Sequence, residues 1–158
     1  MATTDIAVLC RRLESFGTAP PTQEARAELL EGLASKWDGV VVTSARALSK
    51  WGGAQSISAI RDVLAKKAKL ANGWATAGAL TAALAPHMRS DDVTWAVSLV
   101  LKDSNPHYRS NLLQLLMFTP KGQTLRELKK FEGAAGVNPR DLRHAITSVE
   151  MHSQNNVA

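Results

Sequence analysis

The chain has one cysteine, few aromatic residues and no long apolar run, and each shortage excludes a class of structure. Cys10 alone cannot form an internal disulfide or a cysteine-based metal site. Aromatic residues make up only 5 % of the 158 residues, so small side chains must fill much of the core. No apolar segment approaches the roughly 18 residues of a membrane span, and the N-terminus lacks a secretory signal pattern. We therefore expect one soluble, cytoplasmic domain.

The net charge of +5 is distributed unevenly along the chain. Residues 1–60 hold six Lys or Arg and six Asp or Glu, whereas residues 61–158 hold thirteen and eight. The whole basic excess therefore lies in the C-terminal two-thirds. Such an excess favours an acidic partner, which is either nucleic acid or an acidic protein surface.

Residue types that cap helix N-termini recur every 33 or 34 positions. One series consists of Thr4, Asp38, Asn72, Asn105 and Asn138. A second consists of Thr22, Ser56, Ser90 and Thr124. Each precedes an apolar run with helical spacing, so we interpret these residues as N-caps. Two interleaved series with one period indicate a tandem array of helix pairs.

The apolar pattern predicts nine helices and no strand. The segment 112–118 is apolar on nearly all sides and should be the most buried. Thr124 and Glu127 fit a capping box for the eighth helix, although that helix could instead start at Thr119 and Pro120. All four tryptophans fall on or near apolar stripes, and we interpret them as core residues. They are Trp37, Trp51, Trp74 and Trp95. Of the four, Trp51 is the one most readily expected to be exposed, because it lies beside the Gly52–Gly53 turn.

These helices form a single domain over residues 1–152. Its units span about 4–37, 38–71, 72–104 and 105–137, and a last helix over 138–152 covers the end. That helix offers a polar outer face of Arg140, Arg143 and Thr147, as a terminal repeat needs. Residues 153–158 are expected to form a frayed polar tail.

The second unit carries a family resemblance. Ser44–Gly53, with its Ala- and Leu-rich helix and Gly turn, followed by aliphatic Ile57, Ile60 and Leu64, resembles the short bacterial HEAT-like repeat. Residues 75–84 of the third unit are similar. The resemblance implies an all-α, right-handed α-solenoid of about four HEAT-like helix pairs plus a C-terminal capping helix. It also implies that second helices line the concave, partner-binding face, and it implies no shared chemistry.

A search for chemistry finds no catalytic, metal-binding or cofactor-binding set. The histidines are His87, His107, His144 and His152, and none has the spacing of a metal pair. Asp141 lies three residues before His144, which we interpret as a local surface hydrogen bond. Cys10 lies on an apolar stripe and is interpreted as a small core residue. We therefore expect a protein that is not an enzyme.

An enzymatic alternative comes from the bacterial alkylpurine glycosylases, which also use HEAT-like repeats. In that family a tryptophan and an aspartate read a DNA lesion in the groove. Neither Trp74 nor Trp95 has an acidic residue four positions later. A base-directed, DNA-modifying enzyme therefore remains the third hypothesis, and it requires a carboxylate next to an exposed tryptophan.

Lysines form a third periodic series. Lys36, Lys69 and Lys102 are each 33 residues apart, near the ends of second helices. The full predicted partner-binding set is Lys36, Lys66, Lys67, Lys69, Lys102, Lys129 and Lys130. Stacked helices would place these amines along one edge at a spacing of about 10 Å. The alternative explanation is structural, because lysine at a helix C-terminus complements the helix dipole.

The leading functional hypothesis is a non-catalytic protein-interaction module, either an adaptor or an inhibitor of a cognate protein. It would bind an acidic partner through the second-helix face and the basic edge. The runner-up is sequence-independent binding of nucleic acid along the lysines, which would lose affinity steeply with salt. Against it, the sequence lacks the aromatic residues interleaved with basic ones that single-strand binders use.

Overall fold

The computed structural model describes residues 3–152, with side chains from Asp5 onward. Within this range 76 % of the residues are helical, none forms a strand, and there are nine helices when the adjoining α7 and α8 are counted as one. The longer helices are α1 (Thr3–Phe16), α2 (Gln23–Leu33), α3 (Asp38–Trp51), α4 (Ala54–Lys67), α5 (Trp74–Leu84), α9 (Lys121–Lys129) and α10 (Pro139–Met151). The shorter elements are α6 (Val93–Ser98), α7 (Arg109–Leu112), α8 (Gln114–Met117), the 3-10 turns η1 (Ala85–His87), η2 (Ser90–Asp92) and η4 (Pro106–Tyr108), and the π-helical turn η3 (Leu99–Asp103).

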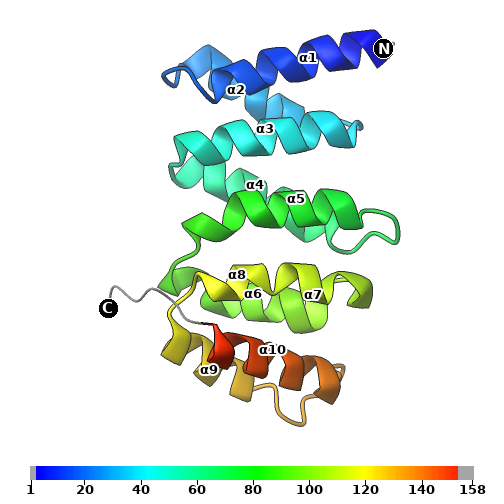
Figure 1. The fold of residues 1–158 in the computed structure, drawn as a ribbon, viewed down its shortest axis with the longest axis vertical. Helices are drawn as coiled ribbons and strands as arrows, with labels where there is room; N and C mark the ends of the chain where they lie inside the picture. The colour runs from blue at the N-terminus through cyan, green and yellow to red at the C-terminus, as the bar shows by residue number, and fades with distance from the viewer. Residues whose placement is uncertain (1–2, 153–158) are drawn as a thin grey trace.

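The helices lie in two layers that run from one end of the molecule to the other (Figure 1). Helices α1, α3, α5, α7–α8 and α10 follow one another in the front layer, and α2, α4, α6 and α9 follow one another behind them. Direct packing joins α1 to α3, α3 to α5 and α5 to α7 in front, and α2 to α4 and α6 to α9 behind. The predicted all-α class is therefore confirmed.

Every passage from a back helix to the next front helix lies on the same side of the molecule, the right in Figure 1. We call this side the turn edge and define it as residues 34–38, 66–74, 102–109 and 129–140. The front-to-back connections lie on the opposite side. A residue type that recurs once per helix pair therefore forms a row along one edge.

Leucine and alanine dominate the core between the layers. The largest fully buried side chains include Leu13, Leu29, Leu48, Ile60, Leu64, Leu80, Leu84, Leu99, Leu101, Leu112 and Leu115. Burying one such side chain stabilises the fold by about 1.5–3 kcal/mol. Burial of these apolar side chains is therefore the main contribution that holds the two layers together. Of the segment predicted to be most buried, Leu112–Leu116 is mostly interior, but Phe118 is 49 % exposed because α8 ends at Met117.

Hydrogen bonds between neighbouring helix pairs repeat at nearly the period seen in the sequence. Ser49 Oγ donates to the carbonyl of Ala83, 34 residues later, at 2.6 Å. Trp51 Nε1 donates to the carbonyl of Phe16, 35 residues earlier, at 2.9 Å. Gln123 Nε2 donates to the carbonyl of Ser90, 33 residues earlier, at 3.0 Å. The period thus corresponds to real contacts between successive pairs.

Three of the predicted N-caps make the expected hydrogen bond. The side chain of Thr22 accepts from the backbone N–H of Ala25 at 3.1 Å. Asn138 accepts from the N–H of Arg140 at 2.9 Å, and Asn105 caps the 3-10 turn η4 by accepting from the N–H of residue 107 at 3.0 Å. The side chain of Thr4 and the predicted tail at 153–158 lie outside the described residues.

Other members of the two series are not caps, and here the prediction was wrong. Ser56 and Thr124 are buried inside α4 and α9, because those helices begin earlier. Gly53, with a positive φ of 85°, turns the chain directly into α4. Helix α9 starts at Lys121, after Pro120, as the alternative start predicted.

The remaining predicted caps lie beside the cap position and not in it. Asp38 is the first residue of α3 and bonds Lys67 instead. Asn72 precedes Gly73, which occupies the cap position of α5 without a side-chain bond. Ser90 begins η2, where Asp92 accepts from the backbone N–H of Arg89 at 2.9 Å. The period located the helix starts to within a few residues, but the capping chemistry differs from start to start.

Candidate interaction surface

All seven lysines predicted from the sequence lie on the turn edge. They are Lys36, Lys66, Lys67, Lys69, Lys102, Lys129 and Lys130. Each lies in the last turn of a back helix or in the turn that follows it. All are exposed except Lys67, whose side chain is 21 % exposed. The structure thus brings the predicted residues to one edge, and whether they bind a partner stays a prediction.

Three of these lysines are already engaged within the protein. Lys67 Nζ lies 2.9 Å from a carboxylate oxygen of Asp38, and Lys130 Nζ lies 2.8 Å from one of Glu127. The ammonium of Lys36 lies 5.3 Å from the ring centre of Trp37. Among the described residues the side-chain ammonium groups of the other four have no ion-pair or hydrogen-bond partner. They are Lys66, Lys69, Lys102 and Lys129.

The Lys67–Asp38 ion pair joins the two helices of one pair, the end of α4 and the start of α3. The hydrogen bond from Lys67 holds the pKa of the Asp38 carboxyl below its ordinary value, and partial burial acts in the opposite direction. The carboxylate therefore stays ionised and neutralises Lys67 at neutral pH. This lysine contributes to the fold, and the four unpaired ones are left to face solvent.

Two tryptophans on the same edge are exposed, which corrects their assignment to the core. Trp37 is 39 % exposed and Trp74 is 66 % exposed. Trp37 is the N-cap residue of α3 and Trp74 is the first residue of α5, so both lie where a front helix begins. Leu70, in the turn beside Trp74, is 49 % exposed. The turn edge therefore combines positive charge with large apolar side chains.

The other two tryptophans are half-buried, and arginines cover their rings. The indole N–H of Trp51 donates to the carbonyl of Phe16, and the guanidinium of Arg26 lies 5.5 Å from its ring centre. The guanidinium of Arg61 lies 4.3 Å from the ring centre of Trp95. Trp51 was the tryptophan expected to be nearest to exposure, yet its indole N–H makes a bond that fixes it against the preceding pair.

A groove beside Trp74 lies on the front layer, next to the turn edge. It has a volume of about 440 Å³. Helix α5 supplies one wall and α7–α8 the other, with the lining residues Trp74, Ala75, Gly78, Ser110, Asn111 and Gln114. None of these lining residues, all within the described part of the chain, carries a charge. The groove is thus a polar-walled depression with one large aromatic side.

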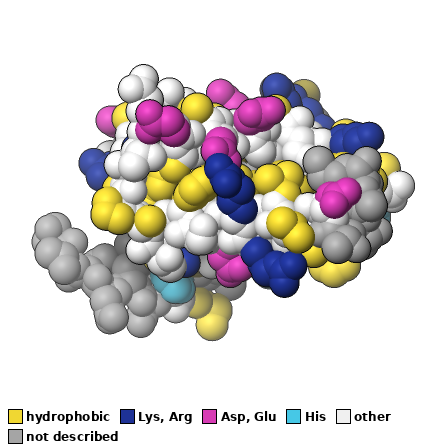
Figure 2. Space-filling view, turned by 90° about the horizontal axis from the view of Figure 1, so that it is seen from above, with side chains coloured by type: hydrophobic (Ala, Val, Ile, Leu, Met, Phe, Trp, Pro, Cys, Tyr) yellow, Lys and Arg dark blue, Asp and Glu magenta, His cyan; other side chains and the backbone are white. Residues whose placement is uncertain are grey.

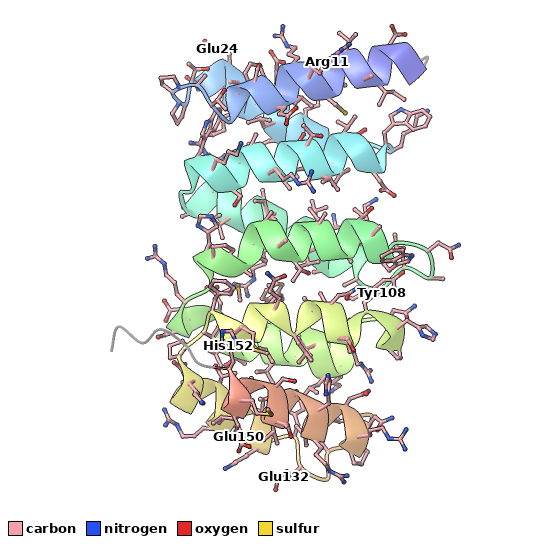
Figure 3. All side chains as sticks on the ribbon, in the orientation of Figure 1. Arg11, Glu24, Tyr108, Glu132, Glu150 and His152 are labelled. Carbon is pink, nitrogen blue, oxygen red and sulfur yellow. The ribbon has the colours of Figure 1, made fainter. Side chains whose placement is uncertain are left out.

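Tyr108 fixes the turn that leads into this groove. Its side chain is 2 % exposed, its hydroxyl donates to the carbonyl of Leu70, and the hydroxyl oxygen accepts from the N–H of Gly73 at 2.7 Å. The N–H of Asn105 also donates to the carbonyl of Ala68 at 2.7 Å. Figure 3 labels Tyr108 at the turn edge, between α5 and the helices that follow it. These bonds hold the turn 68–73, and with it Lys69 and Trp74, in a set position.

No protein-family model, curated protein or solved structure matches this chain.

The back-layer face is not uniformly basic, although the sequence led us to expect binding there. Its exposed residues include the acidic Glu24 and Glu31 on α2, Asp62 on α4 and Asp91 on η2. The end of the molecule formed by α1 and α2 shows acidic and basic side chains together (Figure 2). Along the turn edge, by contrast, the exposed lysines outnumber the exposed acidic residues, which are Asp38, Asp103 and Glu132.

A second hollow lies on the opposite side, between the start of α4 and the turns η1 and η2. It measures about 530 Å³, and its charged lining residues are Arg61, Asp62, Arg89, Asp91 and Asp92, together with His87. Acidic and basic groups nearly balance there, and Arg61 already pairs with Asp92 at 2.9 Å. The hollow thus offers no consistent sign of charge to a ligand.

Potential reactive groups have structural partners. Ser49 Oγ lies 3.1 Å from Nε2 of His87, but the same hydroxyl donates to the carbonyl of Ala83. Asp141 pairs with Arg109 of the preceding helix pair, and not with His144 as predicted. Cys10 is half-buried against the core. Within the described residues no group of three or more His, Cys, Asp or Glu could hold a metal ion, and no helix could span a membrane.

Proposed function

We propose that the protein is a HEAT-like α-solenoid that acts as a non-catalytic interaction module for an acidic partner protein. Two layers of helices joined by contacts at one sequence period support the solenoid. The observation that carries the binding proposal is the combination, on the turn edge, of the exposed Trp74 with a row of unpaired lysines. These lysines are Lys66, Lys69, Lys102 and Lys129. The back-layer face contributes where it adjoins this edge.

The character of the edge favours a protein over nucleic acid. Exposed tryptophan and leucine side chains lie among the lysines, and tryptophan is enriched among the residues that dominate protein interfaces. Charge along the edge would steer an acidic partner and speed association, more than it would add affinity. The apolar side chains would then supply most of the binding energy.

Nucleic-acid binding is the second candidate, because an exposed tryptophan on a lysine-rich edge is also where a base could stack. The two candidates differ in salt dependence. Neutralising several phosphates would give an affinity that falls steeply with salt. A protein interface anchored by apolar side chains would lose association rate with salt and keep much of its affinity.

The experiment is a pull-down from source lysate, with and without nuclease, using a charge-reversed variant. In the variant Lys66, Lys69, Lys102 and Lys129 are changed to Glu. A matched control changes four exposed cations off the edge, Arg11, Arg46, Lys50 and Arg126, to Glu, so that both variants have the same net charge. We expect one protein to be retained through nuclease treatment by the wild type and the control, and lost by the edge variant. Recovery of nucleic acid alone would contradict the proposal. Equal loss of the bound protein in the edge variant and in the control would contradict it as well.

A further inference from the structure

The groove beside Trp74 has features that folding alone does not explain. We propose that it receives an extended acidic segment of the partner, with one bulky apolar side chain placed against Trp74. This inference rests on the proposed function and adds the form of the partner and the place where it binds.

Trp74 is the first feature. Its side chain is 66 % exposed, although a tryptophan contributes most to stability when it is buried. A rigid aromatic ring loses little conformational entropy on binding, and such residues anchor interfaces. The ring forms one wall of the groove, so an apolar side chain entering the groove would cover it.

Gly78 is the second feature. It lies in the middle of α5, where glycine is unfavourable compared with alanine. A Cβ added there would meet no atom within 4 Å, so no neighbouring helix requires the glycine. The missing side chain instead leaves the floor of the groove open. Packing therefore does not account for this glycine, whereas an occupied groove does.

The opposite wall is the third feature. Asn111 and Gln114 are exposed and line the groove, and their side-chain amides have no hydrogen-bond partner among the described residues. Each side-chain amide offers both donors and an acceptor. An extended peptide presents N–H and C=O groups in alternation, so it can pair with two such amides while its side chain reaches Trp74.

The charge around the groove predicts which residues flank the apolar one in the bound partner segment. The lining residues are uncharged, whereas Lys69 and Lys102 lie in the neighbouring turns with no partner among the described residues. Acidic residues that flank the apolar one would meet these lysines. A single strand of nucleic acid fits less well, because it needs a series of open aromatic faces. Trp37, the other exposed indole on the edge, already has Lys36 over its ring.

The test uses two synthetic peptides and measures binding by fluorescence anisotropy. One peptide consists of Asp and Glu with a central Leu, and the other replaces that Leu with Gly. We expect the wild-type protein to prefer the Leu peptide by about tenfold, the ratio that burial of one leucine side chain can supply. Oligothymidylate of similar length is the competing probe.

Two variants remove the proposed pocket in opposite ways. Trp74→Ala deletes the wall, and Gly78→Leu fills the floor while improving the helix propensity of α5. Both should lower the tenfold preference to near one. The matched controls are Trp37→Ala, on the same edge, and Ala82→Leu, an exposed position of α5 outside the groove. Both controls should keep the preference, and Gly78→Leu keeps the test decisive if Trp74→Ala is poorly folded.

The outcomes separate this inference from the proposed function. If charge reversal of the four edge lysines weakens both peptides while Trp74→Ala and Gly78→Leu leave the preference unchanged, the groove is not the site and the inference is wrong. If charge reversal changes the affinity for neither peptide, the proposed function itself is contradicted. Tighter binding of oligothymidylate than of either peptide, lost in Trp74→Ala, would overturn the peptide assignment in favour of a stacked base.

Discussion

Removing the hydroxyl of Tyr108 should loosen the turn that positions Lys69 and Trp74. The buried hydroxyl bonds two backbone groups, the carbonyl of Leu70 and the N–H of Gly73. A hydrogen bond contributes about 1 kcal/mol net, and leaving a buried partner unsatisfied costs about 1–3 kcal/mol. Because the turn is only partly buried, water can replace some of the loss. We therefore expect Tyr108→Phe to lower the free energy of unfolding by about 2 kcal/mol, and Tm by about 4–8 °C.

Urea denaturation followed by circular dichroism gives the global loss, and amide hydrogen exchange gives its location. The N–H of Gly73 should exchange faster in Tyr108→Phe than in the wild type, because it loses its acceptor. The control is Thr43→Val, which removes a hydroxyl that bonds only within its own helix, to the carbonyl of Gly39 at 2.8 Å. A loss below about 0.5 kcal/mol in Tyr108→Phe, or one equal to that of the control, would contradict the role assigned to Tyr108.

Two further predictions concern contacts between helix pairs and within them. Asp38→Asn should cost about 0.5 kcal/mol at pH 7, since the pair with Lys67 is half-exposed and screened. The pKa of Asp38 is lower in the folded protein than in the unfolded chain. The stabilisation is therefore present above about pH 4 and disappears as the pH falls through the folded pKa. Denaturation at several pH values would reveal this loss. Gly32→Ala should be strongly destabilising, because the added Cβ would lie 2.0 Å from Ser44 Oγ. Ser44→Ala should stabilise the protein by about 1 kcal/mol, because that buried hydroxyl has no hydrogen-bond partner among the described residues. Ser44→Ala should also partly rescue Gly32→Ala. Strictly additive changes in the free energy of unfolding of the double variant would refute the contact.

The sequence was sufficient to predict the all-helical class and the row of lysines. Both depend on periodicity, which is a local property: apolar residues at helical spacing build each helix, and a constant distance between helix ends brings equivalent residues to one side. Capping was less predictable. Ser56 and Thr124 are cap-type residues, but each helix begins before them, and their small polar side chains fit into the crowded interior instead.

The exposure of the tryptophans could not be predicted from their stripes. Trp74 and Trp95 both fall on apolar helical spacing, yet Trp74 is the first residue of α5 and is exposed, whereas Trp95 lies within α6 and is half-buried against the core. Trp51 is covered because the helix pair before it offers a carbonyl and an arginine at the right place. Such a neighbour is decided by tertiary packing, which a pattern within one helix does not contain.

The features of the turn edge do not carry equal weight as evidence for binding. Lysine at the end of a helix is favoured by the helix dipole, so the row of lysines would arise in a stack of helices that binds nothing. Trp74 and Gly78 oppose stability where they stand: one leaves a large apolar ring in water, and the other weakens a helix whose neighbours leave room for a side chain. Stability alone would favour a smaller polar residue at the first position and alanine at the second. The groove that these two residues form is therefore the stronger indication of a partner, and the lysines indicate the charge of that partner.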